Sequence, residues 1–451
     1  MTTALDRQFS IDYKLRAVSI CLIVAFLVYS GRFFHLDDAL IYARYISNAL
    51  HGHGLVYNVG QPVNALTSIL DAWLLLGLSW VLHGKILLAQ EIIGASCLIA
   101  AALVAESIVP LAGILIAASS YYYFCIGMET SLFLLLLVLC LKAYLAGKVD
   151  WLPLLCAMTL LARFEGGAIV AIICWRLWQE KRFPRLIAFL PALVLVAFYL
   201  ATNLHYYGVW VPHSATAKFG QGRSGFWGRW PFAFTYLDQY VWLPIFGSRI
   251  VAPVLFFLVW FAAKDKRLAV ANKIVIPFLL FLGTFYILFN IPNYFWYYAP
   301  FLYFSYLYAA HLIPQTKTSW FVALVLVVAL TNVSAVTLRL LGVENTNYAN
   351  LASWLNQNAA QNATIATTET GTIGWYCNRN IIDMVGLTTP QNATFTAHRD
   401  FSSWFLENPD FVVVHPDIPF PWEKVALASP NYEFAPVHFG PVYLLRKKHV
   451  D

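Results

Sequence analysis

Residues 17–45 read AVSICLIVAFLVYSGRFFHLDDALIYARY, and this stretch decides the class of the fold. Its first part, 17–34, has about the 20 mostly apolar residues that a helix needs to cross a bilayer. Asp37 and Asp38 follow directly, and acids this close to a membrane are costly enough to indicate a functional site. Residues 34–45 are expected to form a short amphipathic helix at the interface, with both acids at its N-terminus where the helix dipole favours them. The competing interpretation is a helix cap with a surface ion pair to Arg44.

The composition indicates a polytopic α-helical membrane protein that has the lipid bilayer as a partner. Of the 451 residues, 60% are hydrophobic and only 12% are charged, whereas soluble domains carry roughly 25% charged residues. The net charge of +6 comes from basic residues in short loops, as the positive-inside rule requires, and it gives no indication of nucleic-acid binding.

The apolar stretches predict about 11–13 membrane spans. Arg163–Gly167 interrupts the long stretch 151–177, which we therefore expect to form two short helices with Arg163 and Glu165 at an outer turn. Basic residues near the N-terminus place it in the cytoplasm, so Asp37 and Asp38 lie outside. The distribution of charge leaves the number of spans between 66 and 126 open. The stretches are 17–34, 66–83, 87–106, 109–126, 130–146, 151–177, 186–202, 250–263, 272–290, 296–313 and 318–337.

We expect two domains. Residues 1–338 form the transmembrane domain, with outer loops at 35–65 and 203–249. Residues 339–451 have short apolar runs bounded by turn residues, at 363–367, 381–385 and 411–414, with a helix near 346–358. Such runs are typical of strands, so the C-terminal part is expected to be a small α/β domain outside the membrane.

Four groups of polar residues converge on the outer face if this topology holds. They suit a reaction on a lipid-linked polar group, because a carboxylate can accept the proton of an incoming hydroxyl and a cation can stabilise a phosphate leaving group. An aromatic belt at 286–308, which includes Tyr297, can stack on a sugar. The groups are Asp37, Asp38, Arg44 and Asn58; Glu129 in Gly127–Thr130; Arg163 and Glu165; and His213 and Lys218 in 205–218.

Each of these residues also has a simpler interpretation. Glu129 can cap or pair at a helix end, and Arg163 and Glu165 can pair with each other at their turn. His213 can be an ordinary polar loop residue. The belt around Tyr297 is more often a girdle at the membrane interface than a platform for sugars.

These residues carry a resemblance to a known family. The chain resembles the GT-C membrane glycosyltransferases over about residues 30–415, and among them the actinobacterial terminal arabinofuranosyltransferases and the shorter bacterial enzymes that modify type IV pilins. One motif alone would be weak, but five occur in the expected order. They are Asp37-Asp38 through Thr67-Ser68, Gly127–Thr130, Arg163–Gly166, Tyr207-Gly208 with Pro212, and Lys218, followed by the tail pattern Ile381–Leu387.

The resemblance implies a polyprenyl-phosphate-linked sugar as donor, with arabinofuranose as the expected sugar, and a pilin or a glycan as acceptor. Arg163, Lys218 or Arg249 would face the donor phosphate, and Asp37 or Asp38 would act on the acceptor hydroxyl. The residues expected to bind substrate are Arg44, Asn58, Glu129, Glu165, His213 and Tyr297. The protein would lie in the bacterial inner membrane with its site and its C-terminal domain in the periplasm. Inversion and retention both stay open. No cofactor is obligatory, although the paired acids could hold a divalent metal.

A transporter or flippase of lipid-linked sugar is the alternative function. It predicts polar residues deep within many spans, together with internal repeats. In this sequence the polar residues gather at the outer ends of the apolar stretches, and no repeat is evident.

Overall fold

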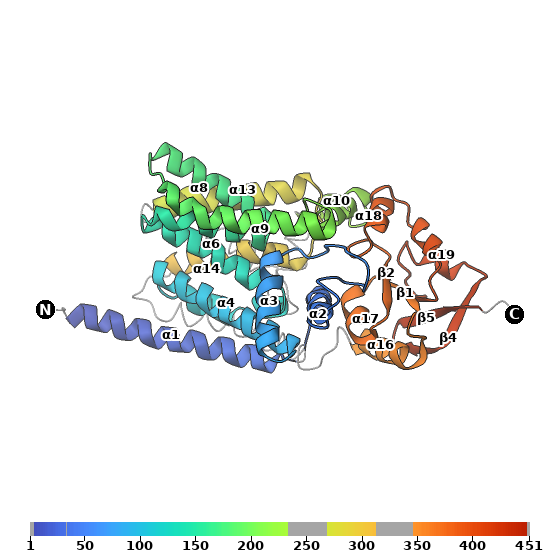
Figure 1. Cartoon of the computed structure of the whole chain (residues 1–451). Helices are drawn as coiled ribbons and strands as arrows, with labels where there is room; N and C mark the ends of the chain where they lie inside the picture. The colour runs from blue at the N-terminus through green and yellow to red at the C-terminus, as the bar shows by residue number, and fades with distance from the viewer. Residues whose placement is uncertain (1–3, 33, 233–267, 313–345, 449–451) are drawn as a thin grey trace.

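Apolar helices fill one end of the molecule and a mixed sheet fills the other (Figure 1). The structure is a computed structural model that describes residues 4–32, 34–232, 268–312 and 346–448. The N-terminus lies at the free end of the helical part, and the C-terminus lies beyond the sheet (Figure 1). The mostly helical protein with a small C-terminal sheet is the fold class that the sequence predicted.

The helical part contains the following apolar helices within the described residues, several of them roughly parallel to α1 (Figure 1). Their apolar side chains leave no polar face, as expected for helices surrounded by protein and lipid. They are α1 (Ala4–Ser30), α4 (Ile86–Ile108), α6 (Thr130–Leu145), α7 (Leu152–Ala162), α8 (Gly167–Gln179), α9 (Leu190–Tyr207), α13 (Ala269–Leu288) and α14 (Ala299–Leu312).

Four segments of the described chain are long and apolar enough to cross a bilayer: Tyr13–Ser30, Ile86–Ile108, Leu186–Tyr207 and Ala269–Leu288. They overlap expected spans. The expected break in 151–177 is confirmed, because the 3₁₀ turn η3 (Phe164–Gly166) separates α7 from α8. The expected spans 250–263 and 318–337 lie outside the described residues.

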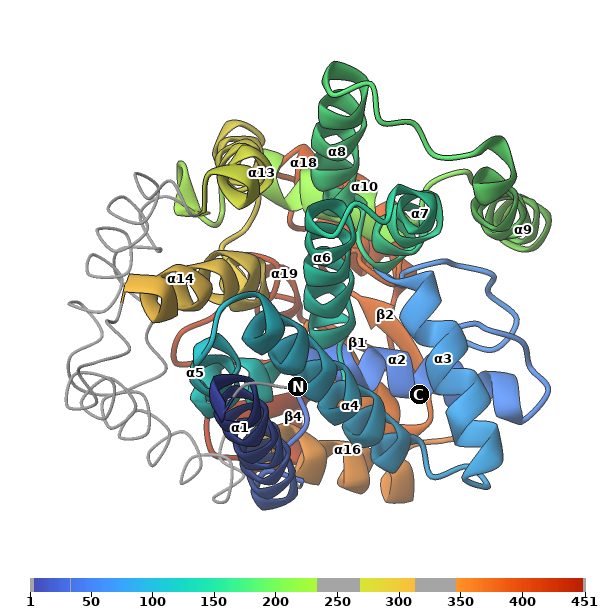
Figure 2. The same ribbon diagram turned by 90° about the vertical axis from the view of Figure 1, so that its left-hand side faces the viewer.

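The region between 66 and 126 differs from the sequence-based expectation. The expected span 109–126 contains α5 (Ala112–Ala118) and the 3₁₀ helix η1 (Ser120–Cys125), so its prediction as one continuous helix is wrong. Helix α3 (Ile69–Val81) runs steeply across the direction of α1 in both views (Figures 1 and 2). With 13 residues it is about 20 Å long, which is shorter than the hydrocarbon core of a bilayer. Apolar composition alone does not distinguish such helices from spans.

Two polar helices, α2 (Asp37–Leu50) and α10 (His213–Ser224), lie between the bundle and the sheet (Figure 1). The expected helix at 34–45 is confirmed as α2, with Asp37 and Asp38 in its first turn, and its place at the membrane interface stays a prediction. The expected domain boundary at residue 338 falls outside the described residues, and the expected outer loop 203–249 is described only as far as residue 232. Short 3₁₀ helices complete the bundle: η2 (Val149–Trp151), η4 (Leu186–Phe189) and η6 (Phe295–Tyr298).

The C-terminal part is a five-stranded mixed sheet with the order β2-β1-β3-β5-β4. Strand β1 pairs in parallel with β2 and β3, whereas β5 is antiparallel to β3 and β4. The expected runs at 363–367, 381–385 and 411–414 and the expected helix at 346–358 are confirmed in this part. Its elements are α16 (Thr346–Asn358), β1 (Thr364–Thr367), α17 (Thr370–Cys377), β2 (Asn380–Asp383), α18 (Pro390–Ala397), η7 (Ser403–Glu407), β3 (Phe411–Val414), α19 (Lys424–Leu427), β4 (Tyr432–Phe439) and β5 (Val442–Lys447).

Both faces of this sheet are buried, and one of them continues the core of the helical part. Ile381 and Leu444 belong to the same apolar cluster as the membrane helices. Their neighbours Ile382 and Leu445 point to the other face, into a second cluster that includes Trp404. The alternation follows from the two-residue period of a strand. The sheet is therefore packed against the bundle through a shared core.

Helix α17 approaches α2 closely because two glycines face it. A side chain at Gly371 would place its Cβ 1.7 Å from the main-chain oxygen of Asp37, and one at Gly374 would meet the Tyr57 hydroxyl at 2.2 Å. Residues three apart lie on the same face of a helix. The Gly-x-x-Gly spacing thus leaves one side of α17 without side chains, and α2 packs against that side.

We predict that Gly371→Ala separates α17 from α2 and lowers the thermal unfolding midpoint of the detergent-solubilised protein. The clash is with backbone, so no side-chain rotation relieves it, and overpacking of this kind costs about 1–3 kcal/mol. Gly77→Ala in α3 is the matched control, because no heavy atom lies within 4 Å of its added Cβ. Equal midpoints for the two variants would contradict the close packing.

Candidate functional site

Arg44 and Asn58, both expected to bind substrate, instead join the membrane part to the C-terminal sheet. The buried Arg44 guanidinium donates to the carbonyls of Tyr57 (2.7 Å), Gly374 (2.5 Å) and Arg379 (2.5 Å). Asn58 donates to the carbonyl of Ile381 and accepts from its N–H. It thereby pairs with the edge strand β2 as a neighbouring strand would.

Asp37 completes this junction at the opposite end of α17. Its two carboxylate oxygens accept hydrogen bonds from the backbone N–H groups of Gly371 (2.9 Å) and Thr372 (2.6 Å). These are orphan donors of the first turn of α17, and a negative charge is favourable there. Arg44 meets the carbonyls at the other end of the same helix, where a positive charge is favourable. The pair therefore holds α17 at both termini.

Burial raises the pKa of Asp37 to about 6, although the N–H groups of Thr372 and Gly371 act in the opposite direction. The neighbouring charge of Asp38 raises it further. Since this pKa lies above the ordinary value, the negative charge of Asp37 disfavours the folded state as the pH rises from about 4 towards 6.

Asp38, by contrast, has a carboxylate without a hydrogen-bond donor or an ion-pair partner among the residues that the structure describes. Burial raises its pKa, while the charges of Lys218 and Arg163 lower it. The two acids at the start of α2 thus differ in their surroundings: Asp37 is saturated by backbone N–H groups, and Asp38 is available.

Lys218 on α10 is the matching cation. Its ammonium makes no hydrogen bond or ion pair to any described residue, and it lies 3.9 Å from the ring centroid of Tyr294. Burial lowers the pKa of Lys218, and the carboxylates of Asp38 and Asp383 raise it. Asp38 and Lys218 therefore act on each other electrostatically, although no ion pair joins them.

Arg163, Glu129 and Glu165 form an ion-pair network. The Arg163 guanidinium donates to Glu129 (2.5 Å) and to Glu165 (2.9 Å), with its side chain 4% exposed. Glu129 also accepts from the Tyr42 hydroxyl on α2, and it is completely buried. The simpler interpretation of Arg163 and Glu165, that they pair at their turn, is confirmed. The network fixes the α7–α8 turn against the helix that carries Asp38.

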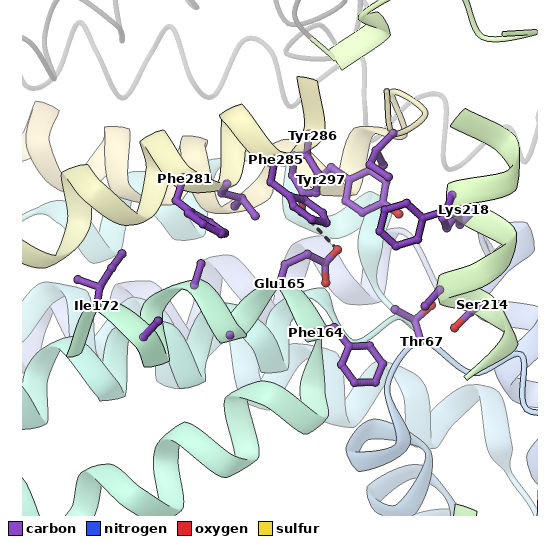
Figure 3. A pocket seen from close by; sticks show the side chains of 17 residues that line it. Thr67, Phe164, Glu165, Ile172, Ser214, Lys218, Phe281, Phe285, Tyr286 and Tyr297 are labelled. Carbon is purple, nitrogen blue, oxygen red and sulfur yellow. Dashed lines mark hydrogen bonds between the residues drawn. The ribbon is translucent and has the colours of Figure 1, made fainter. Parts of the chain in front are cut away.

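An elongated cavity of about 370 Å³ opens between α8, α13 and α10. Figure 3 shows Lys218 and Tyr297 at one end and Ile172 and Phe281 at the other. Glu165 lies between these ends, where it accepts a hydrogen bond from Tyr286. The cavity therefore joins a cationic end to an apolar end.

Of the three remaining expected site residues, one lines this cavity. Tyr297 lines it, with its ring centroid 5.0 Å from the Arg163 guanidinium. His213 is the first residue of α10, and its backbone N–H donates to Asn64. Arg249 lies outside the described residues. The roles expected for these three residues stay predictions.

The sequence analysis assigned no role to Tyr286, Tyr294 or Asp383, all of which are at or near this site. The carboxylate of Asp383 accepts hydrogen bonds from the N–H groups of Val385, Gly386 and Thr388 and acts on Lys218. Its position at the carboxyl end of the parallel strand β2 could have indicated it, because sites form at the carboxyl ends of such strands. The two tyrosines had no signal beyond their membership of the aromatic belt.

The residues present do not form a two-carboxylate metal site. Asp37 is oriented toward the N–H groups of α17, which leaves Asp38 alone. Within the described parts of the chain, no group of three or more His, Cys, Asp or Glu side chains could hold a metal ion. A metal at Asp37 and Asp38 stays a prediction from the sequence, and the chemistry below does not use one.

The arrangement of helices defines a class: a multi-pass membrane protein with the GT-C fold. ArnT from Cupriavidus metallidurans, in a crystal structure bound to undecaprenyl phosphate, is similar with a TM-score of 0.65. The match covers 97% of this chain and 98% of that one at 13% sequence identity. This similarity establishes the fold, and it extends over the membrane helices and the C-terminal sheet together.

Other comparisons add less. Arabinofuranosyltransferase AftD from Mycobacteria matches with a TM-score of 0.37 and 12% identity, over 96% of this chain but only 40% of that one. Residues 337–446 match the model of a domain of unknown function, DUF8728. No curated protein matches the sequence.

We predict that Arg44→Lys loosens the C-terminal part from the bundle. A lysine ammonium cannot reach the three carbonyls that the planar guanidinium contacts, so buried acceptors lose their donors. Limited proteolysis should release C-terminal fragments several-fold faster. Arg446→Lys is the control: Arg446 forms an exposed pair with Glu433, and such pairs contribute about 0–1 kcal/mol. The same rate of cleavage in both variants would exclude the anchoring role of Arg44.

Proposed function

We propose that this protein is a glycosyltransferase that moves a sugar from a polyprenyl-phosphate donor to an envelope acceptor at the outer face of the membrane. The observation that supports this most directly is the cavity with unpaired Lys218 at one end and apolar side chains at the other. An amphiphile with an anionic head and a hydrocarbon chain matches both ends.

The donor would lie with its phosphate at Lys218 and its polyprenyl chain between α8 and α13. Phe281, Phe285 and Ile172 line that part of the cavity, and burying a chain against them is favourable by about 0.8 kcal/mol per CH₂ group. The binding of undecaprenyl phosphate by ArnT, a protein of the same fold, supports this class of ligand. Arg163 would not contact the phosphate directly, because its guanidinium is already paired with Glu129 and Glu165. Its role would be to hold these two glutamates in place.

Asp38 would be the general base. The acceptor hydroxyl loses its proton to Asp38 while its oxygen attacks the anomeric carbon of the donor. The bond from that carbon to the phosphate oxygen breaks, and polyprenyl phosphate leaves with the electron pair. Lys218 stabilises the charge that develops on this leaving group. One available carboxylate is what a single displacement with inversion needs, whereas retention commonly uses a second one as nucleophile.

Asp37 would act as a positioning residue. It fixes the start of α2 against α17 through the N–H groups of Gly371 and Thr372, and Asp38 is the next residue. The C-terminal part therefore contributes to the site through the geometry of α2, and through Asp383 near Lys218.

The finer identity follows from the sequence resemblance. We propose arabinofuranose as the sugar, a pilin or a glycan as the acceptor, and the bacterial inner membrane as the location, with the site in the periplasm. Glu165 and Tyr297, at the cavity wall, are available to contact the sugar. His213, at the start of α10, lies on the same helix as Lys218.

We predict that Asp38→Asn and Asp37→Asn differ in their effects. Asp38→Asn should lower turnover by about 100- to 10,000-fold with an unchanged unfolding midpoint, because it removes the base. Asp37→Asn should lower turnover by only about tenfold and should also lower the midpoint, because its amide group opposes one N–H of α17. Turnover is followed as release of polyprenyl phosphate from polyprenyl-phospho-arabinofuranose, with polyprenyl-phospho-mannose as the comparison.

If Asp37→Asn lowers turnover more than Asp38→Asn does, then Asp37 and not Asp38 is the general base. If neither variant changes release, sugar transfer at this site is excluded, and movement of the lipid-linked sugar between leaflets then needs a direct flipping assay.

A second prediction concerns Lys218→Gln. It should raise the KM for the donor by about tenfold or more, since a charge-assisted contact to phosphate is lost. It should also move the acid limb of the pH–rate profile to higher pH. The Lys218 charge lowers the pKa of Asp38, so its removal lets that pKa rise and Asp38 needs a higher pH to become a base. Lys218→Arg, which keeps the charge, is the control. An unchanged KM and an unmoved acid limb would remove Lys218 from the site.

A further inference from the structure

Three arginines surround a second pocket, of about 410 Å³, beyond the C-terminal end of α10. They are Arg223 in the last turn of α10, Arg229 in the following loop, and Arg399 after α18. All three are exposed. None forms an ion pair or hydrogen bond with any part of the chain that the structure describes. Three like charges around one pocket repel each other, so an anion between them is strongly favoured.

The segment that carries Arg223 and Arg229 is held in place by hydrogen bonds to Asn290. Asn290 follows the end of α13, and its side chain donates to the carbonyls of Gly222 (2.9 Å) and Gly228 (3.0 Å). The same side chain accepts from the N–H of Trp230 at 2.6 Å. It therefore ties the loop after α10 to the end of a membrane helix. Arg223 and Arg229 lie on this tied segment, which reduces the ordering cost of binding a ligand.

The pocket lies next to an apolar surface at the end of a membrane helix. Leu288, the last residue of α13, is 72% exposed, and Phe289 is 50% exposed. Both line an adjacent pocket of about 480 Å³ together with Arg223. Trp230, with the Arg229 guanidinium 4.5 Å from its ring centroid, is of the type that occurs at membrane interfaces. An apolar wall thus leads directly to the cationic pocket.

We propose that this arginine pocket binds the phosphate group of an anionic membrane lipid, whose acyl chains lie on Leu288 and Phe289. Arginine suits this ligand, because its planar donors match phosphate oxygens two at a time. The pocket is separate from the donor cavity, because the two share no lining residue. Arg223 follows Lys218 by more than one helical turn on α10. Lipid binding here does not depend on the proposed sugar transfer.

The test is a binding measurement on the purified full chain in a neutral detergent, by native mass spectrometry. The probes are dioctanoyl phosphatidic acid, dioctanoyl phosphatidylcholine and inorganic phosphate. We expect phosphatidic acid to bind at least about tenfold more tightly than either of the others. Arg223→Gln/Arg229→Gln/Arg399→Gln should abolish this preference.

Lys85→Gln/Lys148→Gln/Lys181→Gln is the matched control, because these three cations are exposed and form no ion pair with a described residue. They lie in the loops before α4, before α7 and after α8. The control should retain binding within about twofold of the unmodified protein. If the triple-arginine variant fails to fold, the single loop variant Arg229→Gln should still weaken binding by about threefold or more.

Three results would overturn the proposal. Phosphatidylcholine carries a phosphate but no net charge, so equal binding of phosphatidic acid and phosphatidylcholine would show that the pocket does not recognise an anionic headgroup. Equal binding of inorganic phosphate would show that the apolar wall contributes nothing. Loss of binding in the control as large as that in the arginine variant would indicate a general attraction to anions.

Discussion

The clamp on α17 is the interaction on which the rest of this structure depends. A carboxylate, Asp37, meets the N–H end of that helix, and a guanidinium, Arg44, meets carbonyls at its other end. Both clamp residues belong to α2, which the membrane bundle supports. Charge and helix dipole therefore agree at each end. The glycine face of α17 lets the two helices approach closely enough for these bonds to form.

This clamp separates two acids that are adjacent in the sequence. Successive residues of a helix point about 100° apart, so Asp37 can turn to α17 while Asp38 turns to Lys218. The Asp37 carboxylate accepts hydrogen bonds from backbone N–H groups, whereas the Asp38 carboxylate has no donor among the described residues. The same division appears among the cations. Arg163 is saturated by Glu129 and Glu165, whereas Lys218 makes no ion pair with a described residue and lies beside the rings of Tyr294 and Trp296. A partly buried charge without a partner is costly, and Asp38 and Lys218 are two such charges at the candidate site.

The C-terminal sheet belongs to the site as much as the helices do. One face of it shares a core with the bundle, and Asn58 completes the hydrogen bonds of its edge strand. Strand β2 ends at Asp383, whose carboxylate acts electrostatically on Lys218. Helix α10 is held close to α18, since a Cβ at Gly220 would lie 2.9 Å from the carbonyl of Ala393. The helix with Lys218 is thus positioned by the C-terminal part, as is the helix with Asp38.

The sequence by itself determined the membrane class, the helix at Asp37 and Asp38, the break at Arg163, and the strands of the tail. Each of these depends on local pattern: apolar length, a charged interruption, or alternation. Only the tertiary structure decided that 109–126 is not one helix, that Arg44 and Asn58 are anchors, and which acid and which cation stay unpaired. These outcomes depend on contacts between residues far apart in the chain. Arg44 meets Gly374, and Lys218 meets Tyr294. Residue types and spacing place charges along a chain, but only packing decides which of them are neutralised.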